Sequence, residues 1–140
     1  MEILLLKPQQ VTRAVLDIFL PLATTKKLTI PQARDIIEKN LAKDVYTYIG
    51  YEAGKPIATA TLVVLDKLIH NGSKVILLED VVVAKEYQGK GYGLKLVKAM
   101  NKKAAKLGGY KSILVCKEYL VDFYGKAGYG FCGYYLRKNL

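Results

Sequence analysis

The residues with the clearest chemical potential lie in one short segment, Gln88-Gly89-Lys90-Gly91-Tyr92-Gly93. An apolar run precedes this segment, and an amphipathic stretch of helical periodicity follows it. Glycine lets consecutive backbone N–H groups point at one place, and the first turn of a helix adds unpaired N–H groups and the positive end of its dipole. The segment therefore predicts a site for an anion such as a pyrophosphate.

Two adjacent acids, Glu79 and Asp80, interrupt the apolar run just before that loop. Because an unpaired buried carboxylate is costly, we expect both to be hydrogen-bonded or to lie at a β-bulge that faces a cleft. A regular strand would send the two side chains to opposite faces of a sheet. The pair could orient an amine and accept its proton, while a salt bridge or a sheet-end cap is the structural alternative.

Two other glycine-rich phosphate motifs do not fit the loop. The P-loop motif G-x-x-x-x-G-K-[ST] does not occur in the chain. The dinucleotide motif needs G-x-G-x-x-G and an acid about twenty residues later. Here the glycines are spaced G-x-G-x-G, and residues 110–116 contain no acid. A purely structural glycine turn remains the alternative.

Few residues could bind a metal or form disulfides. His70 is the only histidine and lies beside Asn71-Gly72, a strong turn signal. Cys116 and Cys132 are too few for a metal cage or a disulfide framework, so no metal site is expected. Both cysteines lie in apolar runs, which predicts buried free thiols.

Length and charge limit the class of protein. The chain has 140 residues, so residues 1–140 are predicted to form a single domain. The formal net charge is +10, and residues 85–140 carry 12 basic and 3 acidic side chains. This excess suggests a polyanion (nucleic acid, membrane lipid or a phosphorylated cofactor) or simply a solvated surface. No signal peptide and no run of about 20 apolar residues is found, so we expect a cytoplasmic protein without a membrane partner.

Periodicity and turn residues predict the elements that position these side chains. The order of elements indicates an α/β domain around a mixed sheet. Strands are predicted at residues 3–7, 45–51, 56–65, 74–83, 111–117 and 131–138, and helices at residues 9–20, 29–41, 94–107 and 118–127. A capping box, Thr29-Ile30-Pro31-Gln32, opens the second helix, and Gly108-Gly109 closes the third.

The pattern Gln88-x-x-Gly91-x-Gly93, with its preceding strand and following helix, resembles the acyl-CoA-binding signature of the GCN5-related N-acetyltransferases (GNAT family). The resemblance covers essentially the whole chain. It implies a mixed central sheet of about six or seven strands flanked by about four helices. It also implies acetyl-CoA as co-substrate, with its pyrophosphate on the amides of Gln88, Gly89, Lys90, Gly91, Tyr92 and Gly93, and its pantetheine arm along Val81, Val82 and Val83.

Further blocks resemble the members of this family that acetylate glucosamine 6-phosphate. These blocks are residues 68–71, 78–83, 87–91 and 123–129. The resemblance implies that Tyr124 lies near the cofactor sulfur as general acid, and that Glu79 or Asp80 helps to remove the amine proton. It also implies a homodimer with sites at the interface, and a substrate site formed by Thr24, Lys67, His70, Glu79, Asp80 and Arg137.

The chain departs from that pattern at three places. Val115 stands where an acid is expected, Leu120 where an asparagine is expected, and Ile76-Leu77 where Gly-His is expected. The acceptor amine therefore stays open between glucosamine 6-phosphate and a polyamine, an amino acid or a protein amine. A non-catalytic acyl-CoA sensor is a further alternative. A basic nucleic-acid-binding module is disfavoured, because the chain has no aromatic-basic RNA signature or recognition-helix pattern.

Overall fold

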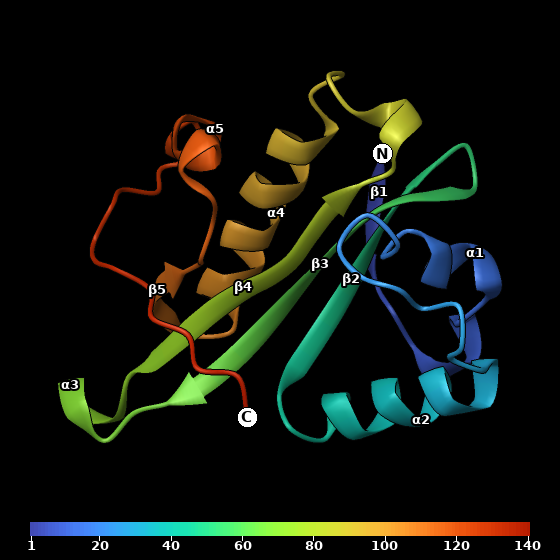
Figure 1. The fold of residues 1–140 in the computed structure, drawn as a ribbon. Helices are drawn as coiled ribbons and strands as arrows, with labels where there is room; N and C mark the ends of the chain where they lie inside the picture. Colours follow the sequence, from blue (N-terminus) through green and yellow to red (C-terminus); the bar gives the residue numbers. More distant parts are fainter.

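The computed structural model describes residues 1–140 as a five-stranded sheet with helices on both faces (Figure 1). The strands are β1 (Glu2–Leu5), β2 (Val45–Glu52), β3 (Lys55–Asp66), β4 (Lys74–Val83) and β5 (Gly109–Ile113). The helices are α1 (Arg13–Asp17), α2 (Ile30–Leu41), α3 (Ile69–Gly72), α4 (Tyr92–Lys106) and α5 (Val121–Gly125). Three short 3-10 turns occur at Pro8–Gln10, Lys85–Tyr87 and Glu118–Leu120.

The strands follow one another in the sheet in the order β1-β2-β3-β4-β5. Neighbours from β1 to β4 are antiparallel, whereas β5 is parallel to β4. The parallel pair is connected through α4, because a parallel connection must cross back over the sheet. The predicted mixed sheet is therefore confirmed.

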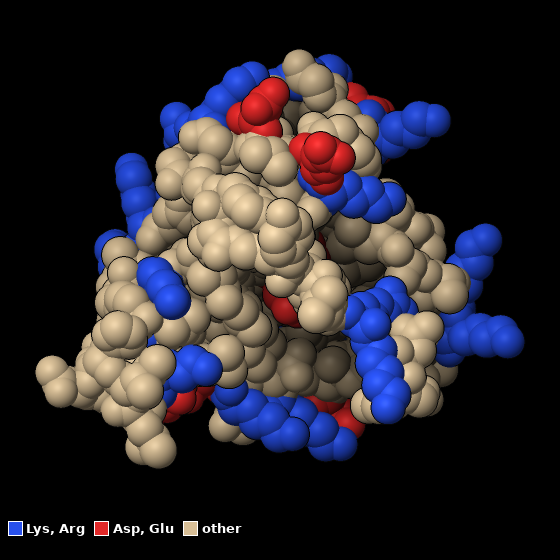
Figure 2. Space-filling view, turned by 60° about the vertical axis from the view of Figure 1, so that its left-hand side comes forward, with Lys and Arg blue, Asp and Glu red and all other residues tan.

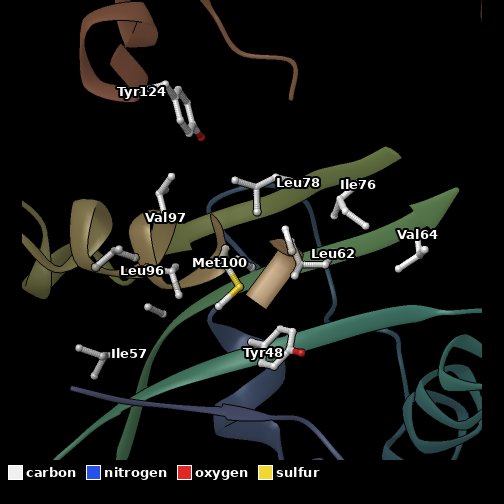
Figure 3. Packing of buried hydrophobic residues seen from close by; sticks show 14 residues of the cluster. Tyr48, Ile57, Leu62, Val64, Ile76, Leu78, Leu96, Val97, Met100 and Tyr124 are labelled. Carbon is white, nitrogen blue, oxygen red and sulfur yellow. The ribbon is translucent and has the colours of Figure 1, made fainter. Parts of the chain in front are cut away.

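Two hydrophobic clusters cover the two faces of the sheet. Leu96, Val97 and Met100 of α4 are completely buried on one face, against strand residues that include Leu62 and Ile76 (Figure 3). The second cluster joins residues of α1 and α2 to Ile49 and Val82. Tyr48 belongs to the first cluster and its neighbour Ile49 to the second, so the clusters lie on opposite faces.

Local sequence signals explain where the two longest helices begin and end. Thr29 accepts a hydrogen bond from the Gln32 backbone, and the Gln32 side chain accepts one from the Thr29 backbone, as the capping box predicts. Helix α4 begins after Gly91 and is followed by Gly108, whose φ is +84°. A left-handed glycine at that position is a common helix C-terminus.

Several predicted elements are shorter than expected. The helix predicted at residues 9–20 reduces to a 3-10 turn and the five residues of α1. The strand predicted at residues 111–117 ends at Ile113, and residues 118–127 form a 3-10 turn and α5.

The prediction of a last strand at residues 131–138 is wrong, which brings the sheet to five strands instead of six or seven. Phe131, Tyr134 and Leu136 are 72%, 93% and 90% exposed. Apolar residues alone do not make a strand, because a strand also needs a neighbouring edge that pairs with its backbone. None of the helices combines the length and the apolar character needed to span a membrane.

Candidate active site

The sheet opens between β4 and β5. The last paired residues are Leu77 of β4 and Ile113 of β5, yet β4 continues to Val83. Residues 78–83 are therefore bound to a neighbouring strand on one edge only, the edge that faces β3. This second, open edge of β4 is where an extended molecule could add to the sheet.

The backbone of Val81 and Val83 faces the open edge. Ala84, just after β4, donates its N–H to Ile57 of β3 at 2.8 Å. Because successive residues of a strand direct their backbone groups to alternate edges, Val83 and Val81 point away from β3. The Gln88 side chain confirms this direction, since its Nε2 donates to the Val83 carbonyl from that side at 2.8 Å.

A β-bulge interrupts β4 at the two acids. Thr61 of β3 pairs with Glu79, but Thr59 pairs with Val82, so two residues of β4 lie opposite one residue of β3. Asp80 has a φ of +50°, in the left-handed region that aspartate adopts more readily than most residues. As a result Leu78 and Val81, three positions apart, both pack against the first hydrophobic cluster, and the two acids lie between them at the bulge.

Neither acid is used for an ion pair. The three ion pairs of the structure involve other carboxylates, and no hydrogen bond binds the side chains of Glu79 or Asp80. Both residues are exposed, although the surrounding chain removes enough water from the Asp80 carboxyl to raise its pKa. The predicted bulge is therefore confirmed, and the salt-bridge alternative is wrong.

The glycine loop leads into α4 at the end of the open edge. Gly89 and Gly91 have φ values of +73° and +81°, and Gly91 is the N-cap of α4. No side chain caps this helix, so the first backbone N–H groups of its 15 residues are free. The ammonium group of Lys90 donates a hydrogen bond to the Glu86 carbonyl at 2.9 Å and adds positive charge at the loop.

Tyr124 lies on α5 above the same region. Its side chain is 8% exposed, and its ring extends from α5 toward β4 (Figure 3). Burial raises the pKa of the Tyr124 hydroxyl, and the nearby Cys116 and Tyr129 add to this effect. The phenol therefore stays protonated at neutral pH and can donate a proton. Phe123 packs edge-on against Tyr124, with 4.9 Å between ring centroids.

The sugar-site residues predicted from resemblance do not all lie near this region. Lys67 and His70 are exposed in the connection between β3 and β4, at the end of β4 opposite the glycine loop (Figure 1). Thr24 is exposed in the connection between α1 and α2, and Arg137 is exposed in the C-terminal segment, where it donates to Asn139 at 2.7 Å. The single chain brings together the acids, the open edge, the loop and Tyr124 only.

The surface around this region is hollowed and basic. Seen from the side of α5, an acidic side chain lies inside the hollow, with Lys and Arg side chains along its rim (Figure 2).

Val115, at the position of the missing acid, is 63% exposed, whereas Leu120 packs against the core. No group of three or more His, Cys, Asp or Glu side chains is arranged to hold a metal ion. Cys116 is half-buried, and the prediction of a buried Cys132 is wrong, because the C-terminal segment is exposed.

One polar network was not predicted from the sequence. The hydroxyl of Tyr129 forms hydrogen bonds with both Asn101 and Ser112 near α5. The three residues come from α4, β5 and the segment after α5, and no motif connects them along the chain. Only the tertiary structure brings them together.

Comparison with known proteins gives consistent matches. The model of the Acetyltransferase (GNAT) family matches residues 12–129. A glucosamine 6-phosphate N-acetyltransferase from Candida albicans is 46% identical over 77 residues, which are 55% of this chain and 52% of that protein. Glucosamine 6-phosphate N-acetyltransferase 1 from Dictyostelium discoideum is 32% identical over 102 residues, which are 73% of this chain and 65% of that protein. The chain thus spans less than two thirds of the length of these curated relatives.

A solved structure extends the likeness over the whole chain. The crystal structure of glucosamine-6-phosphate N-acetyltransferase from Arabidopsis thaliana has a TM-score of 0.91 to this chain at 25% identity. The superposition covers 99% of this chain and 97% of that chain.

Proposed function

This chain belongs to the acetyltransferase (GNAT) family, and from that premise we propose that it transfers an acetyl group from acetyl-CoA to the amine of glucosamine 6-phosphate. The amine attacks directly, with both substrates bound at once. The names of the relatives from Candida albicans, Dictyostelium discoideum and Arabidopsis thaliana support this acceptor.

One observation carries the proposal: the open edge of β4 ends at an uncapped helix N-terminus. The backbone groups of Val81 and the N–H of Val83, which face the open edge, suit an extended pantetheine arm, which forms amide hydrogen bonds as an added strand does. The free N–H groups from Gly91 onward suit the pyrophosphate at the far end of that arm. Residues of this chain thus fit both parts of acetyl-CoA.

Two side chains are suited to the proton transfers. When bound, acetyl-CoA supplies a thioester whose acetyl carbon the amine attacks. Asp80 accepts the proton of the amine, directly or through water, because its raised pKa brings the carboxylate closer to the basicity that this step requires. Glu79, next to Asp80 at the bulge, orients the amine. The Tyr124 hydroxyl, kept protonated by burial, donates its proton where the thiolate leaves.

We assign the remaining substrate contacts to a homodimer. In one chain the predicted substrate-site residues Lys67 and His70 lie at the far end of β4 from the glycine loop, and Arg137 is exposed in the C-terminal segment. That segment also exposes Phe131, Tyr134, Tyr135 and Leu136. Burying these side chains against a second copy would favour association. In such a dimer Arg137 of one copy binds the phosphate of the sugar held by the other.

The test is release of free thiol from acetyl-CoA with four acceptors: glucosamine 6-phosphate, glucosamine, a polyamine and a lysine peptide. Saturable release that requires the sugar phosphate supports the proposal. Tyr124→Phe should lower kcat by about 100-fold, the usual scale of general acid catalysis. Tyr46→Phe is the matched control, because it removes a phenol hydrogen bond of 2.7 Å to Asp44, at the start of β2.

Three results would contradict parts of the proposal. Release with another amine only would exclude the sugar phosphate. Tight acetyl-CoA binding without turnover on any amine would favour a sensor. An unchanged kcat in Tyr124→Phe would exclude the proposed acid.

A further inference from the structure

The segment after α5 ends the helix with a defined motif. The carbonyl of Tyr124 accepts hydrogen bonds from the backbone N–H of Ala127 at 2.9 Å and of Tyr129 at 3.2 Å. The N–H of Gly128 donates to Gly125 at 3.0 Å, and Gly128 has a φ of +92°. This pattern is a Schellman motif, which brings the side chain of Tyr129 next to that of Tyr124. The two rings meet edge to face, with 6.0 Å between their centroids.

The phenol of Tyr129 is bound to two other elements. It donates to Oδ1 of Asn101 on α4 at 2.7 Å. Its single proton is then used, so the hydroxyl of Ser112 on β5 donates to the phenol oxygen at 2.8 Å. The amide nitrogen of Asn101 also donates to the Ala127 carbonyl at 3.0 Å. We call these residues, Asn101, Ser112, Ala127 and Tyr129, the Tyr129 clasp.

Helix α5 depends on such contacts for its position. It has five residues, too few for a helix to be stable in isolation. Residues of this segment that include Leu120, Phe123 and Tyr124 pack against the core. The clasp adds the hydrogen bonds that connect the segment to α4 and β5. A half-buried network of satisfied hydrogen bonds fixes orientation more strictly than apolar packing does.

We propose that Tyr129 is a positioning residue, which through Asn101 and Ser112 holds the Tyr124 hydroxyl over the open edge of β4. The inference rests on the acid role proposed for Tyr124. The hydroxyl of Tyr129 contacts neither the open edge nor the glycine loop. Its effect on the reaction is therefore indirect, through the position of α5 and of Tyr124.

The test is Tyr129→Phe, which removes the hydroxyl and keeps the ring. A displacement of about 1 Å in a catalytic group can lower the rate about 100-fold. Because the ring of Tyr129 remains in place, we expect a smaller displacement of Tyr124 and a fall in kcat of about tenfold. The KM for acetyl-CoA should stay within about twofold, since the clasp contacts no residue of the loop at residues 88–93. In the Tyr124→Phe background the same change should have no further effect on kcat, as expected of residues that act as a unit.

Controls separate positioning from stability. Tyr46→Phe removes a phenol hydrogen bond of the same length, 2.7 Å, far from α5 in the chain, and should leave kcat unchanged. All variants are assayed below their measured Tm. If Tyr129→Phe does not fold, Ser112→Ala removes one bond of the clasp and should lower kcat in the same direction.

The outcomes are distinct. An unchanged kcat in Tyr129→Phe, or an equal loss with and without Tyr124, would overturn the inference. A loss in Tyr124→Phe together with full activity in Tyr129→Phe contradicts only the positioning role. Full activity in Tyr124→Phe contradicts the proposed acid itself.

Discussion

Substituting Gly91 tests the anion site directly. Gly91 has a φ of +81° and caps α4, and a Cβ at this position would meet no heavy atom within 4 Å. The cost of Gly91→Ala is therefore conformational, about 1–2 kcal/mol for placing an L-residue in the left-handed region. For a chain of this size that corresponds to a Tm lower by about 3–8 °C. As the backbone relaxes to reduce this cost, the free N–H groups change direction.

The same substitution should weaken acetyl-CoA binding. Hydrogen bonds to a charged group contribute about 1.5–3 kcal/mol each, so losing one of those made to the pyrophosphate should raise the Kd about tenfold or more. Isothermal titration with CoA and thermal unfolding of the same sample measure the two effects. Both effects should appear together in Gly91→Ala.

Gly108→Ala provides the matched control on the same helix. Gly108 has a φ of +84°, and its Cβ would meet only the Lys74 side chain, at an ordinary 3.8 Å. It lies beyond the other end of the 15-residue α4, about 25 Å from Gly91 at 1.5 Å per residue. We expect a similar fall in Tm and an unchanged Kd. An equal loss of CoA affinity in both variants, or none in Gly91→Ala, would refute the reasoning.

Three further predictions concern the acid, a cap and the core. The raised pKa of Asp80 means that the folded state holds its proton more tightly than the unfolded chain, so this group's contribution to stability is lost as pH rises from about 4 through the folded pKa. Asp80→Asn should therefore raise Tm at pH 7 more than at pH 4, and an equal change at both would contradict this. Thr29→Ala removes the cap bond to Gln32 and should cost about 1 kcal/mol in urea unfolding, with kcat unchanged below Tm. Met100→Ala opens a cavity at a fully buried position and should cost about 2–5 kcal/mol, and a smaller loss would mean that α4 repacks onto the sheet.

Much of the fold follows from local signals in the sequence. The capping box at Thr29, the β-rich runs of β2, β3 and β4, and the glycines that bound α4 each act over a few neighbouring residues. Such patterns are therefore readable without the tertiary structure. The glycine loop belongs to this group, because both its turns and the helix that follows it are local. The bulge at Glu79 and Asp80 was also predictable, since a carboxylate pair cannot remain in a regular buried strand.

What the sequence alone could not supply depends on partners distant in the chain. Residues 131–138 have the composition of a strand, but no edge of the sheet pairs with them. The opening between β4 and β5 exists because their pairing stops at Leu77 and Ile113, which no local pattern signals.

The sequence by itself determined the chemical groups of this protein: an acid pair, a glycine loop at a helix start, and a tyrosine after a phenylalanine. Their assembly was decided by the tertiary structure. Because the sheet opens between β4 and β5, an unpaired edge of β4 leads to the glycine loop. Hydrogen bonds between Tyr129 and residues of α4 and β5 hold α5 beside that edge. The physical reason is one of range, because turns and caps depend on adjacent residues, whereas strand pairing and side-chain networks depend on which distant segments meet.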